Sequence, residues 1–596
     1  MTLRRSDVVI TRPCSMEDYR RYRATALAWG FLPEPDRRGL SPDGEMMRDV
    51  DEAHRCGAKF QGRVELDADW IGMIDYDPDY MDSVVRDIEG RPQYTWWTHR
   101  YRGNPSWHFC TNAPGYRRYL FHQLDRVMKA GTDWLMIDSA IPTIGALTAR
   151  YGGCFCRHCM AGFRDWLAQN TTPEQLAAED VEDICRFDWG EWLRERGVDD
   201  SRYRENIQAF PPTIPLAGRY FDYQWGEVDA LFREFKRRAQ EYRDDYVPMS
   251  SNSPWYWPQF PYAVEAHDFY TNELEYHPPE REVFPTSPIY VLKLAEALGR
   301  IVGLTGIPRA FEPYRLRPRP GHIRLWMAQA AALGHVFMVP AKMWTLRVPG
   351  EADRWYYSDP GDYEEICHFI RDHAGLLDEY ESLASVALVF SNLAVRRFVG
   401  ETRVGRLGGQ ERSAPDTPLH RATLALTHAN IPARLLVAGD GMLPDQLATA
   451  DLDAFQAVVR FEPSPLTEEQ ETRLQRASDR LHTFRSTEAL LATLERPLTL
   501  EGAAGIVAVP RHQPQDPGAP AIVHLLNTNY DAEGDAYHEQ REFTLVLKHW
   551  LYGREFSGAR LHAPGEPAQA LDCVNDDDET RVRVSRLDMW AILELE

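Results

Sequence analysis

The chain has 596 residues, 43% of them hydrophobic, which is enough for roughly three or four domains with sizeable apolar cores. Its formal net charge of −23 argues against nucleic acid or an anionic membrane as a main partner, because both are bound through basic patches. No apolar run approaches the roughly 18 residues of a membrane span, and the N-terminus turns polar before a signal-peptide core forms. With three of the nine cysteines in one short motif, we expect a reducing, cytoplasmic environment.

Up to about residue 383, short apolar runs alternate with helical patterns. The predicted strands are 58–64, 134–138, 246–250, 266–270, 308–312 and 335–339. The predicted helices are 115–130, 163–169, 225–243, 288–302 and 321–333. Repeated strand–helix units with continuously apolar strands are typical of a parallel, right-handed (β/α)8 barrel. We therefore expect an α/β protein whose catalytic barrel occupies residues 1–383.

Two smaller domains are expected after the barrel. Residues 384–495 alternate strands and helices, which predicts a small doubly wound α/β domain. No cysteine lies between Cys367 and Cys573, so this domain lacks the nucleophile of an amidotransferase. Residues 496–596 contain apolar runs between turns rich in Pro, Gly and Asp, which predicts a β-sandwich.

The segment 154–159, Cys-Phe-Cys-Arg-His-Cys, follows the predicted strand 134–138 and carries three cysteines. Thiolates spaced this closely can converge on one soft metal ion such as zinc. Tetrahedral zinc needs a fourth ligand, and both His158 and Cys110 are candidates.

Carboxylates lie at the ends of several predicted strands, which in an α/β barrel face the active-site mouth. Asp138 ends the predicted strand 134–138, taken as the fourth of the barrel. Glu312 ends 308–312, taken as the seventh, and Asp268 and Glu273 lie at or after 266–270, taken as the sixth. A carboxylate pair from different strands is what glycosidic cleavage needs. The alternative is that these residues cap helices or pair with arginines.

Tryptophan is abundant, with 17 residues, and many lie in predicted loops. Indole faces suit the apolar faces of sugar rings, although they also fill protein cores. Loop asparagines can bind sugar hydroxyls, although they are also common turn residues. The substrate-binding candidates are Trp107, Asn112, Asn252, Trp257, Asp268 and Trp344.

Three segments resemble the β-galactosidases of glycoside hydrolase family 42. Residues 110–117, Cys-Thr-Asn-Ala-Pro-Gly-Tyr-Arg, are similar to that family's Cys-Pro-Asn-Ser-Pro-x-Tyr-Arg segment. The cysteine motif and the following 163–167 resemble its zinc motif and the helix after it. Glu312-Pro313, followed by 320–333, resembles the segment that holds its nucleophile. The layout of barrel, glutamine-amidotransferase-like trimerisation domain and β-sandwich is similar as well.

The resemblance implies that Cys110, Cys154, Cys156 and Cys159 hold a structural Zn2+, because four thiolates leave no open position for water. It also implies a carbohydrate substrate and a homotrimer built through 384–495. By analogy Glu312 is the nucleophile and Asp138 the acid/base. The reverse assignment stays open, and Glu273 is the reserve acid/base.

One departure from the family concerns the fourth strand, where the family carries Asn-Glu and this chain has Asp138-Ser139. The chain is in this respect more similar to uncharacterised glycosyl-hydrolase-like barrels. We expect a retaining glycoside hydrolase that removes a terminal sugar from a small oligosaccharide or glycoside. The alternatives are a non-catalytic sugar-binding or assembly protein and another reaction on carbohydrate, such as a lyase or transglycosylase reaction.

Overall fold

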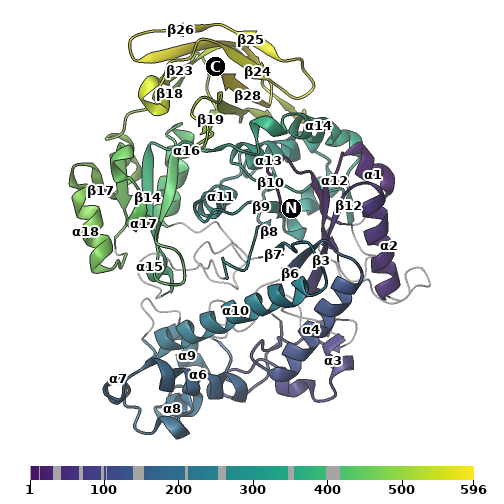
Figure 1. Ribbon diagram of the computed structural model, residues 1–596, viewed down its shortest axis with the longest axis vertical. Helices are drawn as coiled ribbons and strands as arrows, with labels where there is room; N and C mark the ends of the chain where they lie inside the picture. Colours follow the sequence, from purple (N-terminus) through teal and green to yellow (C-terminus); the bar gives the residue numbers. More distant parts are fainter. Residues whose placement is uncertain are drawn as a thin grey trace.

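The computed structural model describes residues 2–12, 14–30, 42–65, 72–95, 100–101, 104–138, 153–207, 213–252, 263–345, 355–396, 417–462 and 464–596. Within these residues, no helix is both long enough and apolar enough to cross a bilayer. A central strand–helix region carries a parallel sheet on one side and two antiparallel sheets at one end (Figure 1).

Eight parallel strands form a ring in the central region. Five pair in the order β1-β2-β3-β6-β7 and three in the order β10-β9-β8. Bridges from Asn252 to Thr271 and from Ile10 to Val339 join the two sheets at both edges. This closed order is the arrangement of a (β/α)8 barrel. The strands are β1 (Val9–Ile10), β2 (Ala26–Gly30), β3 (Lys59–Glu65), β6 (Trp134–Asp138), β7 (Met249–Ser251), β8 (Tyr270–Leu274), β9 (Val302–Gly306) and β10 (Val336–Phe337).

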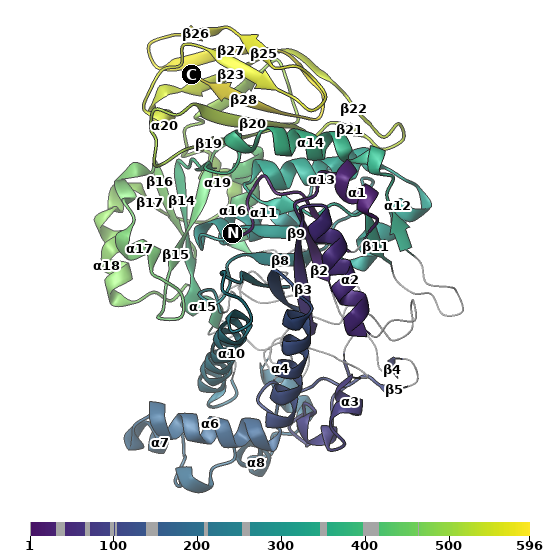
Figure 2. The same ribbon diagram turned by 45° about the vertical axis from the view of Figure 1, so that its right-hand side comes forward.

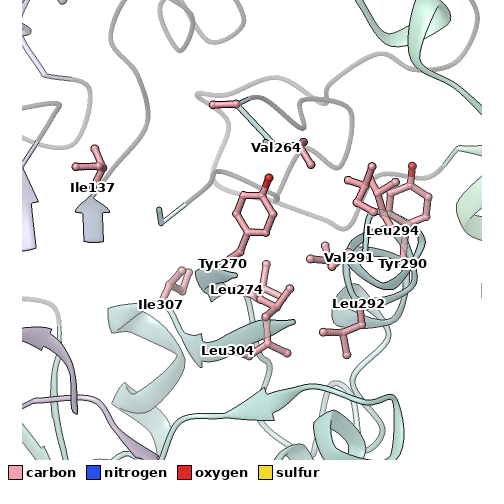
Figure 3. Close-up of a cluster of buried hydrophobic side chains, with 14 of the residues drawn as sticks. Ile137, Val264, Tyr270, Leu274, Tyr290, Val291, Leu292, Leu294, Leu304 and Ile307 are labelled. Atoms are coloured by element: carbon pink, nitrogen blue, oxygen red, sulfur yellow. The ribbon is translucent and has the colours of Figure 1, made fainter. Parts of the chain in front are cut away.

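Helices cover the outside of the ring. The main ones are α2 (Pro42–Arg55), α4 (Pro114–Lys129), α10 (Ala217–Gln240), α11 (Ser287–Ala297), α13 (Pro320–Ala332) and α14 (Glu364–Asp372). Tyr270 and Leu274 of β8 and Leu304 of β9 lie toward α11, where Val291 belongs to the same buried cluster (Figure 3). Because side chains alternate along a strand, Thr271 and Glu273 point to the opposite side, into the ring.

The sequence predicts some of these strands correctly. The strands at 58–64 and 134–138 are confirmed as β3 and β6. The strand predicted at 266–270 begins four residues too early, because β8 starts at Tyr270. The strand predicted at 308–312 is wrong: Pro308–Phe311 is a 3-10 turn, and Glu312 begins the short helix α12 (Glu312–Leu316).

Two helices, α4 and α10, extend away from the ring toward a helical extension (Figure 2). The extension consists of α6 (Arg157–Asn170), α7 (Pro173–Ala178), α8 (Trp189–Glu195) and α9 (Asp200–Ile207). Its core is aromatic, since Phe155 stacks on Trp189 at 5.4 Å and meets Tyr203 edge-on at 5.0 Å. The cysteine motif lies where this extension begins.

Outside the ring, the larger sheets of the described residues are one parallel and two antiparallel sheets. The parallel sheet has the order β15-β14-β16-β17, with β14 (Val386–Ser391), β15 (Ala433–Ala438), β16 (Ala457–Arg460) and β17 (Leu481–Thr483). The six-stranded antiparallel sheet contains β13 (Glu381–Ser382), β19 (Ile506–His512), β20 (Ala521–Asn527), β28 (Trp590–Leu595), β24 (Ala559–His562) and β25 (Gln569–Leu571). The four-stranded one contains β18 (Leu498–Glu501), β23 (Gln540–Lys548), β27 (Glu579–Leu587) and β26 (Cys573–Asn575). Apolar residues of both antiparallel sheets share one core.

Helix α11 contacts both the parallel sheet and the six-stranded antiparallel sheet. Lys293 donates to the carbonyl of Ala433 at 2.7 Å, which joins α11 to the parallel sheet. Glu296 pairs at 3.0 Å with Arg511 of β19, whose side chain is 1% exposed. Burial opposes the ionisation of Glu296, but the Arg511 charge lowers its pKa to about 2. The pair is therefore charged at neutral pH and links α11 to the six-stranded sheet.

Candidate active site

The interior of the ring is layered. Along β6, Trp134, Met136 and Asp138 share one face because every second residue of a strand points the same way. The first two belong to a small apolar cluster with residues of β1, β2 and β10, and this cluster fills the ring below its mouth. Only Asp138, at the carboxyl end of β6, reaches the mouth.

A polar layer lies above the apolar cluster. Gln61 of β3 donates to the Ser250 hydroxyl of β7 at 2.9 Å, and that hydroxyl contacts the Thr271 hydroxyl of β8 at 2.6 Å. One step further along the same strand faces lie Arg63, Asn252 and Glu273. The two-residue period of the strands thus brings charged side chains together at the mouth.

Asp138 is held by an arginine on the neighbouring strand. The Arg63 Nε lies 2.5 Å from Asp138 Oδ2, and Arg63 also pairs with Glu65 two residues further along β3. Asp138 is 7% exposed, so its pairing with Arg63 is largely shielded from solvent. The sequence does contain a signal for Arg63, namely the alternation of Gln61, Arg63 and Glu65 at the end of a predicted strand.

Asn252 joins the two carboxylates of the mouth. Its Nδ2 donates to Asp138 Oδ1 at 3.0 Å and to Glu273 Oε2 at 3.4 Å, and its Oδ1 accepts from the backbone N–H of Glu273 at 3.2 Å. Asp138 Oδ1 and Glu273 Oε2 accept from the same Asn252 nitrogen. The two oxygens therefore lie no further apart than the sum of their distances to that nitrogen. The structure therefore brings Asp138, Asn252 and Glu273 together.

The pKa of Glu273 is raised to about 7. The largest cause is desolvation by burial, and the next is the negative charge of Asp138. The guanidinium groups of Arg12 and Arg63 and the hydrogen bond from Asn252 act in the opposite direction. Glu273 is therefore a carboxyl group that holds its proton up to near-neutral pH, next to a carboxylate paired with arginine.

Glu312 is positioned by a short helix and not by the end of a strand. It begins α12, six residues after β9 ends, and its Oε1 accepts from Arg315 at 2.9 Å, one helical turn later. On the seventh strand itself, Thr305 is the residue in register with Glu273. The prolines at 308 and 313 favour first-turn positions of short helices rather than a barrel strand, which explains why the predicted strand is wrong.

Asp268 lies at the other end of β8 from Glu273. It pairs with Lys236 at 3.1 Å and accepts from the Tyr246 hydroxyl at 2.5 Å and from the Met249 N–H at 2.8 Å. These contacts fix the amino ends of β7 and β8. Asp268 therefore lies at the amino ends of these strands, whereas Glu273 lies near the carboxyl end of β8.

The aromatic candidates divide into described and undescribed residues. Trp107 is 8% exposed and stacks on Tyr94 with ring centroids 4.2 Å apart. Trp257 and the side chain of Trp344 lie outside the described residues, although the Trp344 backbone pairs with Trp355.

The four predicted metal ligands do come together. The sulfur atoms of Cys110, Cys154, Cys156 and Cys159 lie within 4.8 Å of one another, and all four residues are buried. Sγ of Cys110 is 3.4 Å from that of Cys159 and 3.6 Å from that of Cys156. These distances exclude a disulfide, which needs about 2.0 Å, and fit the roughly 3.8 Å edge of a tetrahedron with 2.3 Å bonds to zinc.

Hydrogen bonds from the other cysteines lower the pKa of Cys156, whereas burial raises the pKa of Cys110 and of Cys159. Cys156 caps the N-terminus of α6, where the helix dipole favours negative charge, and Asn112 Nδ2 lies 3.4 Å from the Cys159 sulfur. Asn112, predicted to bind substrate, thus belongs to the cysteine cluster. His158 points elsewhere, with its Nε2 2.9 Å from Asp82. The connection from Asp138 to the cluster, 139–152, falls outside the described residues.

No protein-family model matches the sequence. The chain is 26% identical over 616 aligned residues to an α-agarase of Thalassotalea agarivorans, covering 99% of this chain but 40% of that protein. It is 24% identical over 236 residues to β-galactosidase BgaP of Planococcus sp. (strain L4), covering 38% of this chain and 33% of that protein. Among solved structures, a β-galactosidase from Bacillus circulans sp. alkalophilus superposes over 99% of both chains with a TM-score of 0.62 at 13% identity.

These similarities define a class. The chain is glycoside-hydrolase-like in sequence, and its fold is that of barrel glycoside hydrolases. It spans about 40% of the length of the α-agarases that it matches.

Proposed function

We propose that the protein is a retaining glycoside hydrolase in which Asp138 and Glu273 form the catalytic pair. The observation that carries this proposal is the double hydrogen bond of Asn252, which holds both carboxyl groups at the mouth of the ring. Carboxyl groups from two different strands on either side of one scissile bond are the requirement for this reaction.

The environments of the two groups support different roles. Glu273, with its pKa raised to about 7, can donate a proton to the glycosidic oxygen. Asp138, beside Arg63, is placed to attack the anomeric carbon, so that a glycosyl ester forms as the protonated aglycone leaves. Glu273, now ionised, then takes a proton from water as that water cleaves the ester. Both residues return to their starting states.

The separation of the pair supports retention of configuration. Retaining enzymes keep their carboxyl groups about 5–5.5 Å apart, and inverting enzymes about 6.5–9.5 Å apart to admit a water. The two Asn252 contacts, at 3.0 and 3.4 Å, bring one oxygen of each carboxyl group close enough for the retaining separation.

The substrate class rests on the names of the relatives. An α-agarase and a β-galactosidase are among the proteins that the sequence matches. We therefore propose a galactose-containing oligosaccharide or glycoside, from which a terminal sugar is removed. The sugar, the linkage and the anomeric configuration follow from product analysis.

The cysteine cluster has a structural role in this proposal. A zinc ion on Cys110, Cys154, Cys156 and Cys159 would have a complete shell of four thiolates, with no position for a reacting water. We propose in addition that residues 1–383, 384–495 and 496–596 are separate domains and that 384–495 assembles a cytoplasmic homotrimer. Light scattering that finds a stable monomer at micromolar concentration would contradict the trimer.

The test of function is a panel of aryl glycosides and galactose oligosaccharides, with product stereochemistry followed by proton NMR. We expect turnover of at least one galactoside, with the first-formed product keeping the anomeric configuration of the substrate. Inversion would contradict the roles of the pair. Sugar binding without turnover of any substrate would favour the non-catalytic alternative.

A further inference from the structure

A hairpin from the C-terminal antiparallel sheets contacts the central region. Its strands β21 (Tyr530–Asp531) and β22 (Ala536–Tyr537) pair in the connection between β20 and β23. The hairpin extends from these sheets toward α13 and contacts the first turn of that helix (Figure 2). Helix α13 belongs to the connection after β9, at the end of the ring where the mouth lies. The hairpin therefore brings a C-terminal segment to one of the loops of the mouth.

Asp535 of the hairpin caps the N-terminus of α13. Arg319, which precedes the helix, makes no side-chain cap of its own. Instead the Gly321 N–H donates to Asp535 Oδ1 at 3.0 Å and to Oδ2 at 3.3 Å. The Tyr530 hydroxyl donates to Asp535 Oδ1 at 2.6 Å, and the Tyr537 hydroxyl donates to the Gly321 carbonyl at 3.1 Å. A Cβ on Gly321 would lie 2.7 Å from Asp535 Oδ1, so this close approach needs glycine.

His322, the next residue of α13, joins the hairpin to the loop after β8. Its ring stacks on Tyr530 with centroids 5.2 Å apart. Its Nε2 lies 2.7 Å from the Val283 carbonyl, and its Nδ1 lies 2.6 Å from the Tyr314 hydroxyl of α12. Because a carbonyl oxygen only accepts, Nε2 carries the proton and Nδ1 accepts from Tyr314. Burial lowers the pKa of His322 to about 4, so the ring is neutral and keeps both hydrogen bonds at neutral pH.

Trp326, one turn further along α13, packs against the same loop close to Glu273. The ring centroids of Trp326 and Tyr276 lie 4.4 Å apart, and both side chains are buried. Tyr276 follows Glu273 by three residues, since β8 ends directly after Glu273. The loop 275–283 is therefore held against α13 near its start by Tyr276 and at its end by Val283.

We propose that the β21–β22 hairpin positions the loop 275–283, and with it Glu273, through the cap that Asp535 places on α13. The inference rests on the proposed function, in which Glu273 is the general acid. Such an acid must lie within hydrogen-bond reach of the glycosidic oxygen, so a small displacement of its strand end lowers turnover more than binding. Asp535 acts through α13 and is thus a positioning residue for the reaction.

Asp535→Gly and Asp535→Asn form the test pair. Asp535 has a φ of 49°, a left-handed conformation that glycine and asparagine adopt more readily than other residues. Glycine removes the cap without backbone strain, whereas the side-chain oxygen of asparagine still accepts from the Gly321 N–H. Tyr380→Phe is the matched control, because it removes a different contact with the antiparallel sheets, the hydrogen bond from the Tyr380 hydroxyl to the Pro520 carbonyl at 2.8 Å.

Hydrogen–deuterium exchange of the full-length chain measures the positioning of the loop without turnover. We expect peptides that cover 275–283 to exchange at least about threefold faster in Asp535→Gly, because local opening precedes exchange. Asp535→Asn and Tyr380→Phe should exchange like the wild-type chain over this segment. Peptides from β27 report global unfolding and should be unchanged in all variants. If Asp535→Gly does not fold, Tyr530→Phe, which removes only the hydroxyl that holds Asp535, provides the same readout.

Kinetics on the best substrate then test the consequence for Glu273. Asp535→Gly should lower kcat by about tenfold or more and change KM less than about twofold, and asparagine at this position should restore kcat. The alkaline limb of the pH–rate profile should move to lower pH, because a looser loop admits water and lessens the desolvation that raises the pKa of Glu273. Asp138, Arg63 and Arg12 also act on this pKa, but they belong to other segments of the ring and keep their places.

Three results would overturn the proposal. They are unchanged exchange over 275–283 in Asp535→Gly, faster exchange with unchanged kcat, and an Asp535→Asn variant that loses as much as Asp535→Gly. A wild-type chain that hydrolyses no substrate, together with faster exchange in Asp535→Gly alone, would refute the proposed function and still support the positioning of the loop by the hairpin.

Discussion

Replacing Glu273 by glutamine is expected to lower kcat/KM by about 10²- to 10⁴-fold on a substrate with a poor leaving group, since the general acid is lost. An aryl glycoside with an acidic phenol needs little protonation, so its glycosylation step should be affected less. The same variant should also lose the alkaline limb of the pH–rate profile. In the wild-type chain this limb should lie near pH 7, because activity falls as Glu273, with its pKa raised to about 7, gives up its proton.

Two further variants complete this experiment. Asp138→Asn should cause a comparable loss on every substrate, because the nucleophile is needed whatever the leaving group. Glu312→Gln is the matched control, since Glu312 pairs with Arg315 and has no step in the proposed reaction. Full activity of Glu273→Gln together with inactivity of Glu312→Gln would show that the seventh-strand segment holds the catalytic carboxylate after all.

Replacing Cys110 by serine is expected to produce the largest loss of stability. The variant should bind less than one zinc per chain and lose at least about 4 kcal/mol, as expected when a structural metal is lost. Cys110 and Cys159 join the chain before α4 to the first turn of α6, so the helical extension should become sensitive to protease first. Plasma mass spectrometry and limited proteolysis measure the two effects.

Cys185→Ser is the control for the cysteine experiment. Cys185 lies in the same extension but is exposed and outside the cluster, so its loss should change neither the zinc content nor the stability. Wild-type protein that is purified without chelators, contains no zinc and is fully stable would contradict the structural metal.

The sequence is most informative where local pattern and tertiary role agree. Asp138 is identifiable because a continuously apolar strand, 134–138, ends in one carboxylate, and the structure places it at the mouth. Three cysteine ligands are identifiable from their close spacing and the fourth, Cys110, from the family resemblance, and all four sulfur atoms do meet. In both cases a short segment carries most of the information.

The sixth and seventh strands show why the rest could not be predicted. Thr271, Asn272 and Glu273 are polar and resemble a loop, yet they lie inside β8, where Thr271 and Glu273 face a ring interior that is polar at this level. β9 contains Gly303 and Gly306, which weaken the strand pattern, and the sequence predicts a helix up to Val302 and no strand over 302–306. The bridge of Asn252 and the pairing of Arg63 with Asp138 join distant strands, and such contacts leave no local pattern.

The most direct test of the catalytic pair is covalent trapping. A 2-deoxy-2-fluoroglycosyl fluoride of the sugar that the enzyme hydrolyses should inactivate it, and peptide mapping by mass spectrometry should find one label per chain. We expect the label on Asp138, as a glycosyl ester formed next to Arg63. A label on Glu312 or on Glu273 would contradict it.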